Sequence, residues 1–173
     1  MEALLKVNDI SMVFGGLRAV SNFSMEIKAG ELIGLIGPNG AGKTTLFNSI
    51  SGFYPPTSGS VFFEGKDITG LPSYEVCRLG LARTFQIVQT LKEMTVEENV
   101  MTGAFLHTRS TRAARAAARE ILELVGMSGK RDILGGSLTI VDKKRLEIAR
   151  ALATKPKLLM LDECMAGLNQ TEI

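Results

Sequence analysis

Residues 34–45, GLIGPNGAGKTT, constrain the fold and chemistry of this chain more than any other part of its sequence. Within them, residues 37–44 fit the pattern G-x-x-x-x-G-K-[ST] of a phosphate-binding loop. The pattern needs glycines because backbone N–H groups must close around the phosphates, and a Cβ would block that approach. Lys43 supplies a positive charge to the outer phosphates, and the Thr44 hydroxyl is placed to ligate Mg²⁺. The pattern therefore predicts a nucleotide-binding protein.

The residues on either side of this loop support the same interpretation. Residues 31–36, ELIGLI, predict a buried strand, and residues 43–50, KTTLFNSI, predict a helix. Strand, loop and helix in this order form the setting that the motif requires. The alternative, a glycine-rich turn with a chance lysine, is disfavoured by this context.

Composition excludes several classes of protein. The chain has 173 residues, enough for one domain with a core, and its net charge of +2 gives no argument for a nucleic-acid partner. Cys77 and Cys164 lack C-x-x-C spacing and His107 is the only histidine, so neither a disulfide framework nor a histidine metal site is expected. The sequence contains neither a membrane-spanning apolar run nor a signal peptide. We therefore expect a soluble, cytosolic protein unless a partner tethers it.

The hydrophobic pattern predicts further elements along the chain. Strands are expected at 4–7, 23–27, 60–63, 80–85 and 157–161, the first three antiparallel. Helices are expected at 72–79, from 96 onward, at 112–125 and at 142–153. Thr95 and Glu98 have the spacing of a capping box at the start of the second helix. This order predicts an α/β core formed by about 1–86 and 136–173, with an inserted helical stretch at about 87–135.

Three arginines are predicted to share one face of the helix at 112–125. Arg112, Arg115 and Arg119 lie three and four positions apart, which places them side by side on a helix. A solvated face is the favoured interpretation, and contact with an anionic partner is the alternative.

Two acidic residues follow the apolar run LLML at 158–161. Asp162 is placed to hold Mg²⁺ through water, and Glu163 can polarise an attacking water. Beside a phosphate-binding loop, this interpretation is favoured over two solvated acids at a strand end. Gln86, after another predicted strand, can contact Mg²⁺ or the water, although a single Gln is weak evidence. Phe14 can stack on an adenine, and a core phenylalanine explains it equally well.

The motifs in combination resemble an ABC-transporter ATPase subunit, in particular the branched-chain amino acid uptake group. They are VFGG, GPNGAGKTT, PPTSG, ARTFQ, TVEENV and KKRLEIARALATKPKLLMLDE, and they extend over essentially the whole chain. The resemblance implies a single ABC ATPase domain over 1–173. Its fold would be a P-loop NTPase core of the α/β class, with an antiparallel β-subdomain and an inserted helical subdomain.

The resemblance also implies a role for individual residues. ATP would be bound by Phe14, Gly37, Pro38, Asn39, Gly40, Ala41, Gly42, Lys43, Thr44 and Thr45. Hydrolysis would use Glu163, Lys43 and Gln86, and Mg²⁺ would be held by Thr44, Gln86 and Asp162. Residues 166–169 resemble the D-loop, with Asn169 in place of its usual aspartate.

The loop that resembles the ABC signature differs from LSGGQ. It consists of Leu138, Thr139, Ile140, Val141 and Asp142, and it would contact the ATP bound by a partner ATPase. Both glycines are lost, and the Asp142 carboxylate lies at a helix N-terminus, where it is expected to compete with phosphate. Some members of the branched-chain group carry a signature of this kind.

Two further departures concern the C-terminal part. Cys164 stands where a proline usually follows the glutamate, and the switch histidine of the family is expected some tens of residues beyond Ile173. His107 lies upstream and cannot be that histidine. The chain therefore resembles a subunit truncated at its C-terminus, and we expect hydrolysis by this chain alone to be impaired.

The expected function is that of an ATP-binding and ATP-hydrolysing subunit of an ABC importer, with branched-chain amino acids as the expected substrates. The expected partners are membrane permease subunits, a second ATPase subunit in a homo- or heterodimer and, indirectly, a substrate-binding protein, with no nucleic acid. The chain would lie peripherally on the cytoplasmic face of the plasma (inner) membrane. The alternatives are a weakly hydrolysing or non-hydrolysing nucleotide-gated subunit and a non-transport ABC ATPase. A small GTPase is disfavoured, because D-x-x-G at 67–70 has no accompanying N-K-x-D.

Overall fold

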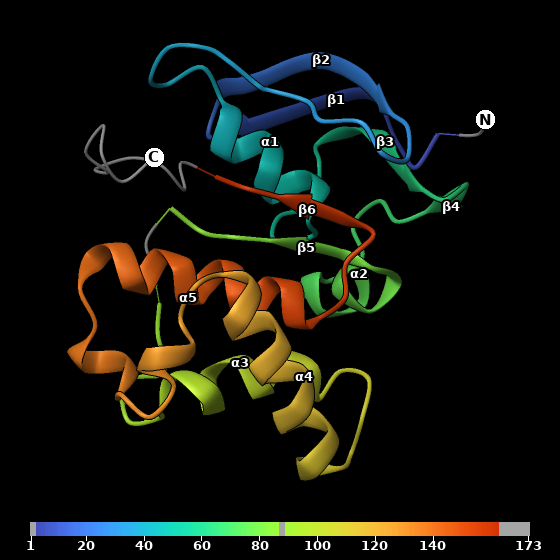
Figure 1. The fold of residues 1–173 in the computed structure, drawn as a ribbon. Coiled ribbons are helices and arrows are strands. Elements are labelled where there is room, and N and C mark those ends of the chain that lie inside the picture. The colour runs from blue at the N-terminus through green and yellow to red at the C-terminus, as the bar shows by residue number, and fades with distance from the viewer. Residues whose placement is uncertain (1–2, 87–88, 163–173) are drawn as a thin grey trace. The chain divides into compact units, whose positions relative to one another are not determined.

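The computed structural model describes residues 3–86 and 89–162, which fall into two compact units divided between Leu79 and Gly80 (Figure 1). Glu163, Cys164 and the predicted D-loop at 166–169 lie outside the described residues.

An antiparallel sheet of order β2-β1-β3-β4 forms much of the first unit. Its strands are β1 (Leu5–Phe14), β2 (Leu17–Ile27), β3 (Ser58–Phe63) and β4 (Lys66–Asp67). Gly15 and Gly16 have φ angles of +53° and +91°, which glycine adopts readily, and they turn the chain between β1 and β2. The predicted antiparallel strands are therefore confirmed, and all three are longer than predicted.

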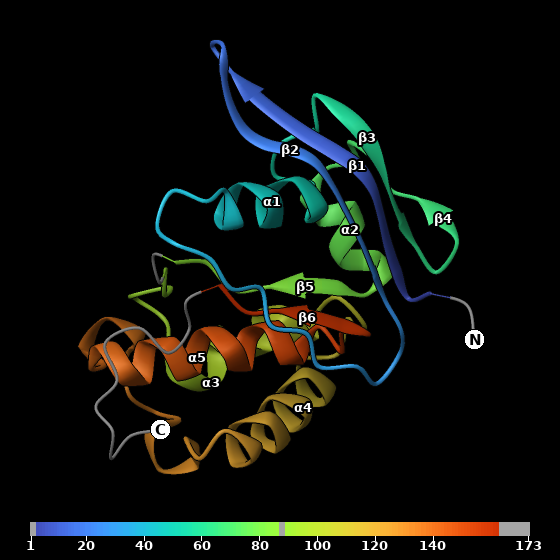
Figure 2. The same cartoon turned by 90° about the horizontal axis from the view of Figure 1, so that it is seen from above.

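Two helices accompany this sheet. Helix α1 (Lys43–Ile50) lies along it, as Figure 2 shows, and α2 (Ser73–Leu79) follows β4. Leu46 and Ile50 of α1 are buried, as are Leu5 and Phe63 of the sheet. Burial of these side chains holds α1 in the first unit and so positions the loop before it.

The buried strand predicted at 31–36 is wrong. These residues form no strand in the described structure, and Leu32 and Ile36 are 99% and 95% exposed. A buried strand needs neighbouring strands that bond to its N–H and C=O groups. None of the four strands of the first unit's sheet pairs with this segment. Its apolar pattern alone therefore does not place it in that sheet.

The described residues of the second unit combine a parallel strand pair with three α-helices. Strand β5 (Leu81–Arg83) pairs with β6 (Leu158–Met160), with Ala82 opposite Leu159. The helices are α3 (Val96–Ala104), α4 (Thr111–Leu124) and α5 (Ile140–Ala153), and 3₁₀ turns lie at Ser128–Lys130 and Gly135–Ser137. All three helices contribute to one hydrophobic cluster, which includes the fully buried Val100, Ala118 and Leu146.

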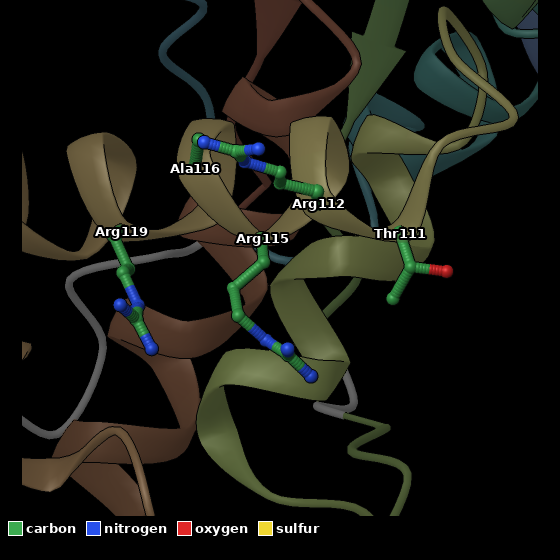
Figure 3. A pocket seen from close by; sticks show the side chains of 5 residues that line it. All are labelled: Thr111, Arg112, Arg115, Ala116 and Arg119. Atoms are coloured by element: carbon green, nitrogen blue, oxygen red, sulfur yellow. The ribbon is translucent and has the colours of Figure 1, made fainter.

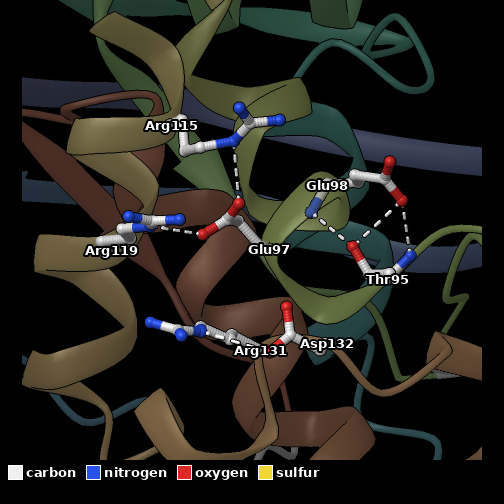
Figure 4. Close-up of polar contacts among 7 residues, drawn as sticks. All are labelled: Thr95, Glu97, Glu98, Arg115, Arg119, Arg131 and Asp132. Carbon is white, nitrogen blue, oxygen red and sulfur yellow. Dashed lines mark hydrogen bonds and ion pairs between the residues drawn. The ribbon is translucent and has the colours of Figure 1, made fainter. Parts of the chain in front are cut away.

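The arginine face of α4 is exposed, but it is not simply solvated. Figure 3 shows Arg112, Arg115 and Arg119 lining a surface pocket of about 500 Å³ that includes none of the predicted site residues. Arg115 and Arg119 both pair with Glu97, at 2.9 and 2.6 Å (Figure 4). Because Glu97 is a buried residue of α3, these two arginines connect α4 to α3.

The predicted capping box at the start of α3 is confirmed. The Thr95 hydroxyl accepts from the Glu98 N–H at 3.2 Å, and the Glu98 carboxylate accepts from the Thr95 N–H at 2.8 Å (Figure 4). Two N–H groups at the helix terminus are satisfied in this way, which fixes where α3 begins.

A buried asparagine ties the segment before α3 to the helix. Asn99 is 0% exposed. Its Oδ1 accepts from the Leu91 N–H at 2.9 Å, and its Nδ2 donates to the carbonyls of Leu91, Met94 and Thr95 at 2.9–3.1 Å. The three carbonyls also accept backbone N–H groups, from Met94, Gly135 and Asn99 itself. Loss of the side chain would therefore remove four hydrogen bonds and take the Asn99 acceptor away from the Leu91 N–H.

Replacing this side chain should destabilise the protein. Asn99→Ala removes the bonds to the 91–95 segment and should lower the free energy of unfolding by about 2–3 kcal/mol, measured by urea denaturation. Glu93→Ala, at an exposed position of the same segment, is the matched control and should have little effect. Equal stability of the two variants would contradict the role given to Asn99.

Candidate functional site

The phosphate-binding loop approaches α1 through two glycines in left-handed conformations. Gly40 and Gly42 have φ angles of +82° and +84°. A Cβ on Gly40 would meet no atom within 4 Å, whereas a Cβ on Gly42 would lie 2.3 Å from the Ala19 carbonyl oxygen. Gly42 is therefore needed for the close approach to β2, and Gly40 leaves the space above the loop open. Both roles fit a loop that encloses phosphate.

The N-terminus of α1 has the properties of an anion site. Gly42 is its N-cap, no side chain caps the helix, and its first turn has no acidic residue. The first N–H groups of a helix lack partners within the helix, and the helix dipole places partial positive charge there. Phosphate satisfies both, so the local geometry fits a nucleotide.

Lys43 folds back over the same loop. Its Nζ donates to the carbonyls of Gly37 and Pro38, at 2.6 and 2.8 Å. The ammonium group is thus held beside the helix N-terminus by the loop that it serves. Thr44 and Thr45, both half-buried, follow in the first turn. This arrangement brings the predicted phosphate-binding residues together within the first unit.

Phe14 lies at the end of β1 and is 45% exposed, which argues against the core interpretation of this ring. Tyr54 packs against it edge-on, with ring centroids 6.1 Å apart, and Phe53 contacts Tyr54 at 5.0 Å. An exposed ring supported from its side can stack on a planar base. Tyr54 was not predicted as part of the site, since only the fold brings it beside Phe14.

In the second unit, Asp162 lies just after β6 and is 6% exposed. Its N–H donates to the Thr84 hydroxyl at 3.1 Å, and its carboxylate pairs with the Arg83 guanidinium at 3.5 Å. Burial lowers the pKa of Arg83, while the charges of Asp162 and Glu147 act in the opposite direction. The parallel pairing of β5 and β6 therefore places a buried carboxylate beside a buried cation. Neither Arg83 nor Thr84 was recognised from the sequence.

Gln86 lies shortly after β5 and is exposed. The preceding residue, Phe85, donates its N–H to the Glu147 carboxylate at 2.7 Å, and the centroid of its ring lies 4.5 Å from the Arg83 guanidinium carbon. Helix α5 and strand β5 thus both contact the residue next to Gln86.

The signature-like loop forms a cap at the start of α5. The Thr139 hydroxyl accepts from the Asp142 N–H at 3.2 Å and donates to the Asp142 carboxylate at 2.9 Å. Lys130 lies 2.6 Å from the same carboxylate. Burial opposes ionisation of Asp142, but hydrogen bonds from Lys130 and Thr139 and nearby positive charges outweigh it, so its pKa lies below its usual value. The Asp142 carboxylate was expected to compete with phosphate at this helix N-terminus. Because Lys130 offsets its negative charge, that competition should be weaker than the sequence alone predicts.

Two further observations apply to residues 3–86 and 89–162. They contain no group of three or more His, Cys, Asp or Glu side chains placed to hold a metal ion. Every helix among them is too short or too polar to cross a lipid bilayer.

The Asp142–Lys130 pair predicts a dependence of stability on pH. A carboxylate whose pKa is depressed by folding stabilises the protein above its unfolded pKa of about 3.9, and this contribution is lost as the pH falls through the folded pKa. Asp142→Asn should therefore lower the free energy of unfolding by about 1–2 kcal/mol at neutral pH and much less near pH 3, measured by urea denaturation.

Asp132→Asn is the matched control, since Asp132 also pairs with a cation, Arg131, but its side chain is 85% exposed. It should change stability little at either pH. A loss from Asp142→Asn that is no larger than this, or that persists unchanged in acid, would contradict the assignment.

Comparisons with known sequences agree with this geometry. A family model described as ABC transporter matches residues 20–166. The high-affinity branched-chain amino acid transport ATP-binding protein LivG of Salmonella typhimurium is 44% identical over 99% of this chain and 73% of its own length. The corresponding BraF protein of Pseudomonas aeruginosa is 40% identical over 98% of this chain and 72% of its own.

Solved structures give the same result. The ADP conformation of MJ1267, an ATP-binding cassette of an ABC transporter, matches with a TM-score of 0.85 and 36% identity over 98% of this chain and 72% of that one. A dimeric post-hydrolysis state of the ATP-binding cassette MJ0796, bound to ADP and Pi, matches with a TM-score of 0.87 and 25% identity over 97% of this chain and 77% of that one. The chain therefore belongs to the ABC transporter family and has the ABC ATPase fold.

Proposed function

We propose that this chain is the ATP-binding and ATP-hydrolysing subunit of an ABC importer for branched-chain amino acids. The observation that carries the proposal is the uncapped N-terminus of α1, reached through Gly40 and Gly42, with the Lys43 ammonium folded over the loop. The importer assignment and the substrate class are supported by relatives that are branched-chain amino acid transport ATP-binding proteins.

Different residues of the chain would bind the base and the phosphates of ATP. Phe14, held from its side by Tyr54, would stack on the adenine. The backbone N–H groups of the loop and of the first turn of α1 would bind the phosphates. Lys43 would exchange its carbonyl partners for the outer phosphate oxygens.

For hydrolysis, Asp162, Thr44 and Gln86 would hold Mg²⁺, which, when bound, neutralises charge on the phosphates. The oxygen ligands offered by these residues suit Mg²⁺, which binds few protein groups and keeps several waters. Glu163 would orient the attacking water and accept its proton, and Lys43 would stabilise the charge that develops on the transferred phosphoryl group.

The same proposal includes partners and location. The chain would act peripherally at the cytoplasmic face of the plasma membrane, docked to permease subunits and paired with a second ATPase subunit. The dimeric MJ0796 cassette supports the pairing. Residues 138–142 would then face the nucleotide of the partner ATPase. The proposed subdivision remains a core of about 1–86 and 136–173 with a helical subdomain at about 87–135.

A weakly hydrolysing, nucleotide-gated subunit is the second candidate. It is favoured by the loss of both signature glycines and by the use of Thr139 as the cap of α5. Glu163 in the sequence favours hydrolysis, and turnover in the presence of the partner ATPase separates the two candidates.

Lys43→Ala should weaken ATP binding and leave the fold intact. In the described structure the Lys43 ammonium is bonded to loop carbonyls, so its loss removes a charge for phosphate without opening the core. Affinity measured by calorimetry should fall at least about tenfold, since a charge-assisted hydrogen bond contributes on the order of 1.5–3 kcal/mol. Lys66→Ala, an exposed lysine of β4, is the control. Unchanged affinity in Lys43→Ala would refute the loop assignment.

Glu163→Gln should separate binding from hydrolysis. The amide preserves the shape of the side chain but cannot accept the proton of the attacking water, so turnover should fall on the order of 100-fold or more. ATP affinity should remain near that of the unsubstituted protein. Both are measured on the full-length protein assembled with its partner subunits, and native turnover in this variant would remove Glu163 from catalysis.

A further inference from the structure

Helix α5 contacts the chain on both sides of Gln86. The Glu147 carboxylate accepts from the Phe85 N–H at 2.7 Å, before Gln86. The Arg150 guanidinium donates to the Gln89 carbonyl at 2.5 Å, after it. Glu147 and Arg150 lie three positions apart, so they project from the same face of α5.

Both side chains are partly withdrawn from water to make these contacts. Each is intermediate in exposure. Burial raises the pKa of Glu147, whereas the Phe85 N–H and the charges of Arg150 and Arg83 act in the opposite direction. Burial likewise lowers the pKa of Arg150, and Glu147 opposes that change. The two residues therefore compensate each other's desolvation while each binds the backbone near Gln86.

The same backbone is connected to Asp162. Arg83 pairs with Asp162 at 3.5 Å, donates from Nε to the Thr84 carbonyl at 3.1 Å, and lies over the Phe85 ring. The Glu147 carboxylate accepts a hydrogen bond from the N–H of the residue after Thr84, which is Phe85. Contacts from Asp162, β5 and α5 thus converge on the two residues that precede Gln86.

We propose that Glu147 and Arg150 are positioning residues that hold the chain on both sides of Gln86, and that they link the position of Gln86 to the helix beginning at Thr139. The inference rests on the proposed ATPase function, and neither residue contacts nucleotide in it. Because α5 starts within the signature-like loop, a displacement of α5 on contact with a partner's nucleotide would be transmitted to Gln86 through these two bonds.

The test compares steady-state ATP turnover of the full-length assembly carrying Glu147→Leu or Glu147→Gln. Leucine cannot accept a hydrogen bond from the Phe85 N–H. Turnover should therefore fall about tenfold relative to the unsubstituted assembly, while ATP affinity stays within about twofold. Glutamine keeps an acceptor oxygen and should restore most of the activity. Glu120→Leu, at an exposed glutamate of α4, controls for the apolar substitution.

A double-mutant cycle with Gln86→Ala separates positioning from general destabilisation. If Glu147 acts through Gln86, Glu147→Leu should cause no further loss of turnover once Gln86 is removed. Hydrogen exchange at the Phe85 amide should be faster in Glu147→Leu and unchanged in Glu147→Gln. Arg150→Met and Arg150→Lys provide a second pair, in which lysine should retain more turnover than methionine because it keeps a donor.

The outcomes distinguish this inference from the proposed function. The inference would be overturned if Glu147→Leu lowered turnover by the same factor in the Gln86→Ala background as in the unsubstituted protein. It would also be overturned if Glu147→Leu left both turnover and hydrogen exchange at the Phe85 amide unchanged. Either outcome would leave the ATPase assignment standing. Absence of turnover in the unsubstituted assembly would overturn the proposed function, and with it the catalytic effect inferred for Glu147.

Discussion

The first unit depends on the close approach of Gly42 to the Ala19 carbonyl. Any side chain at this position would enter the space of that oxygen, so the left-handed turn of Gly42 lets α1 begin against β2. The helix consequently starts without a side-chain cap, and its first N–H groups remain suited to an anion. Lys43 then adds its charge above the loop. A left-handed glycine turn, a helix without a side-chain cap and a lysine held over the loop all fit a site for phosphate.

In the second unit, α5 combines tasks that concern different parts of the proposed mechanism. Its N-terminus is capped by Thr139, which bonds to Asp142. Its buried side, including Leu146, packs with α3 and α4. Its Glu147 side chain accepts from the backbone just before Gln86. A packed helix moves as a rigid element, so its two ends and its polar contacts are mechanically linked. Polar pairs within the unit also fix the helix in place, as Lys130 does by pairing with Asp142 in the first turn of α5.

Much of the fold could be predicted because its signals are local. The capping box of Thr95 and Glu98, the helix after Lys43 and the hairpin glycines each act over a few residues. The segment 31–36 was misjudged because burial of a strand depends on neighbours that its own sequence does not specify. The pair of Arg83 with Asp162 joins positions 79 residues apart, so only the parallel pairing of β5 and β6 reveals it. For the same reason, motifs indicated the candidate catalytic residues, but the side chains that contact their neighbours, such as Arg83 and Glu147, could not be predicted from the sequence.

The most direct measurement of the central claim is a calorimetric titration with ATP, ADP, AMP and adenosine under identical salt and Mg²⁺ conditions. If the N-terminus of α1 and Lys43 bind the β- and γ-phosphates, affinity should rise at least about tenfold from AMP to ADP, since each added phosphate gains charge-assisted contacts. Adenosine, restricted to stacking on Phe14, should bind most weakly. Equal affinities for AMP and ATP would contradict the claim, because the loop would then contribute nothing to nucleotide binding.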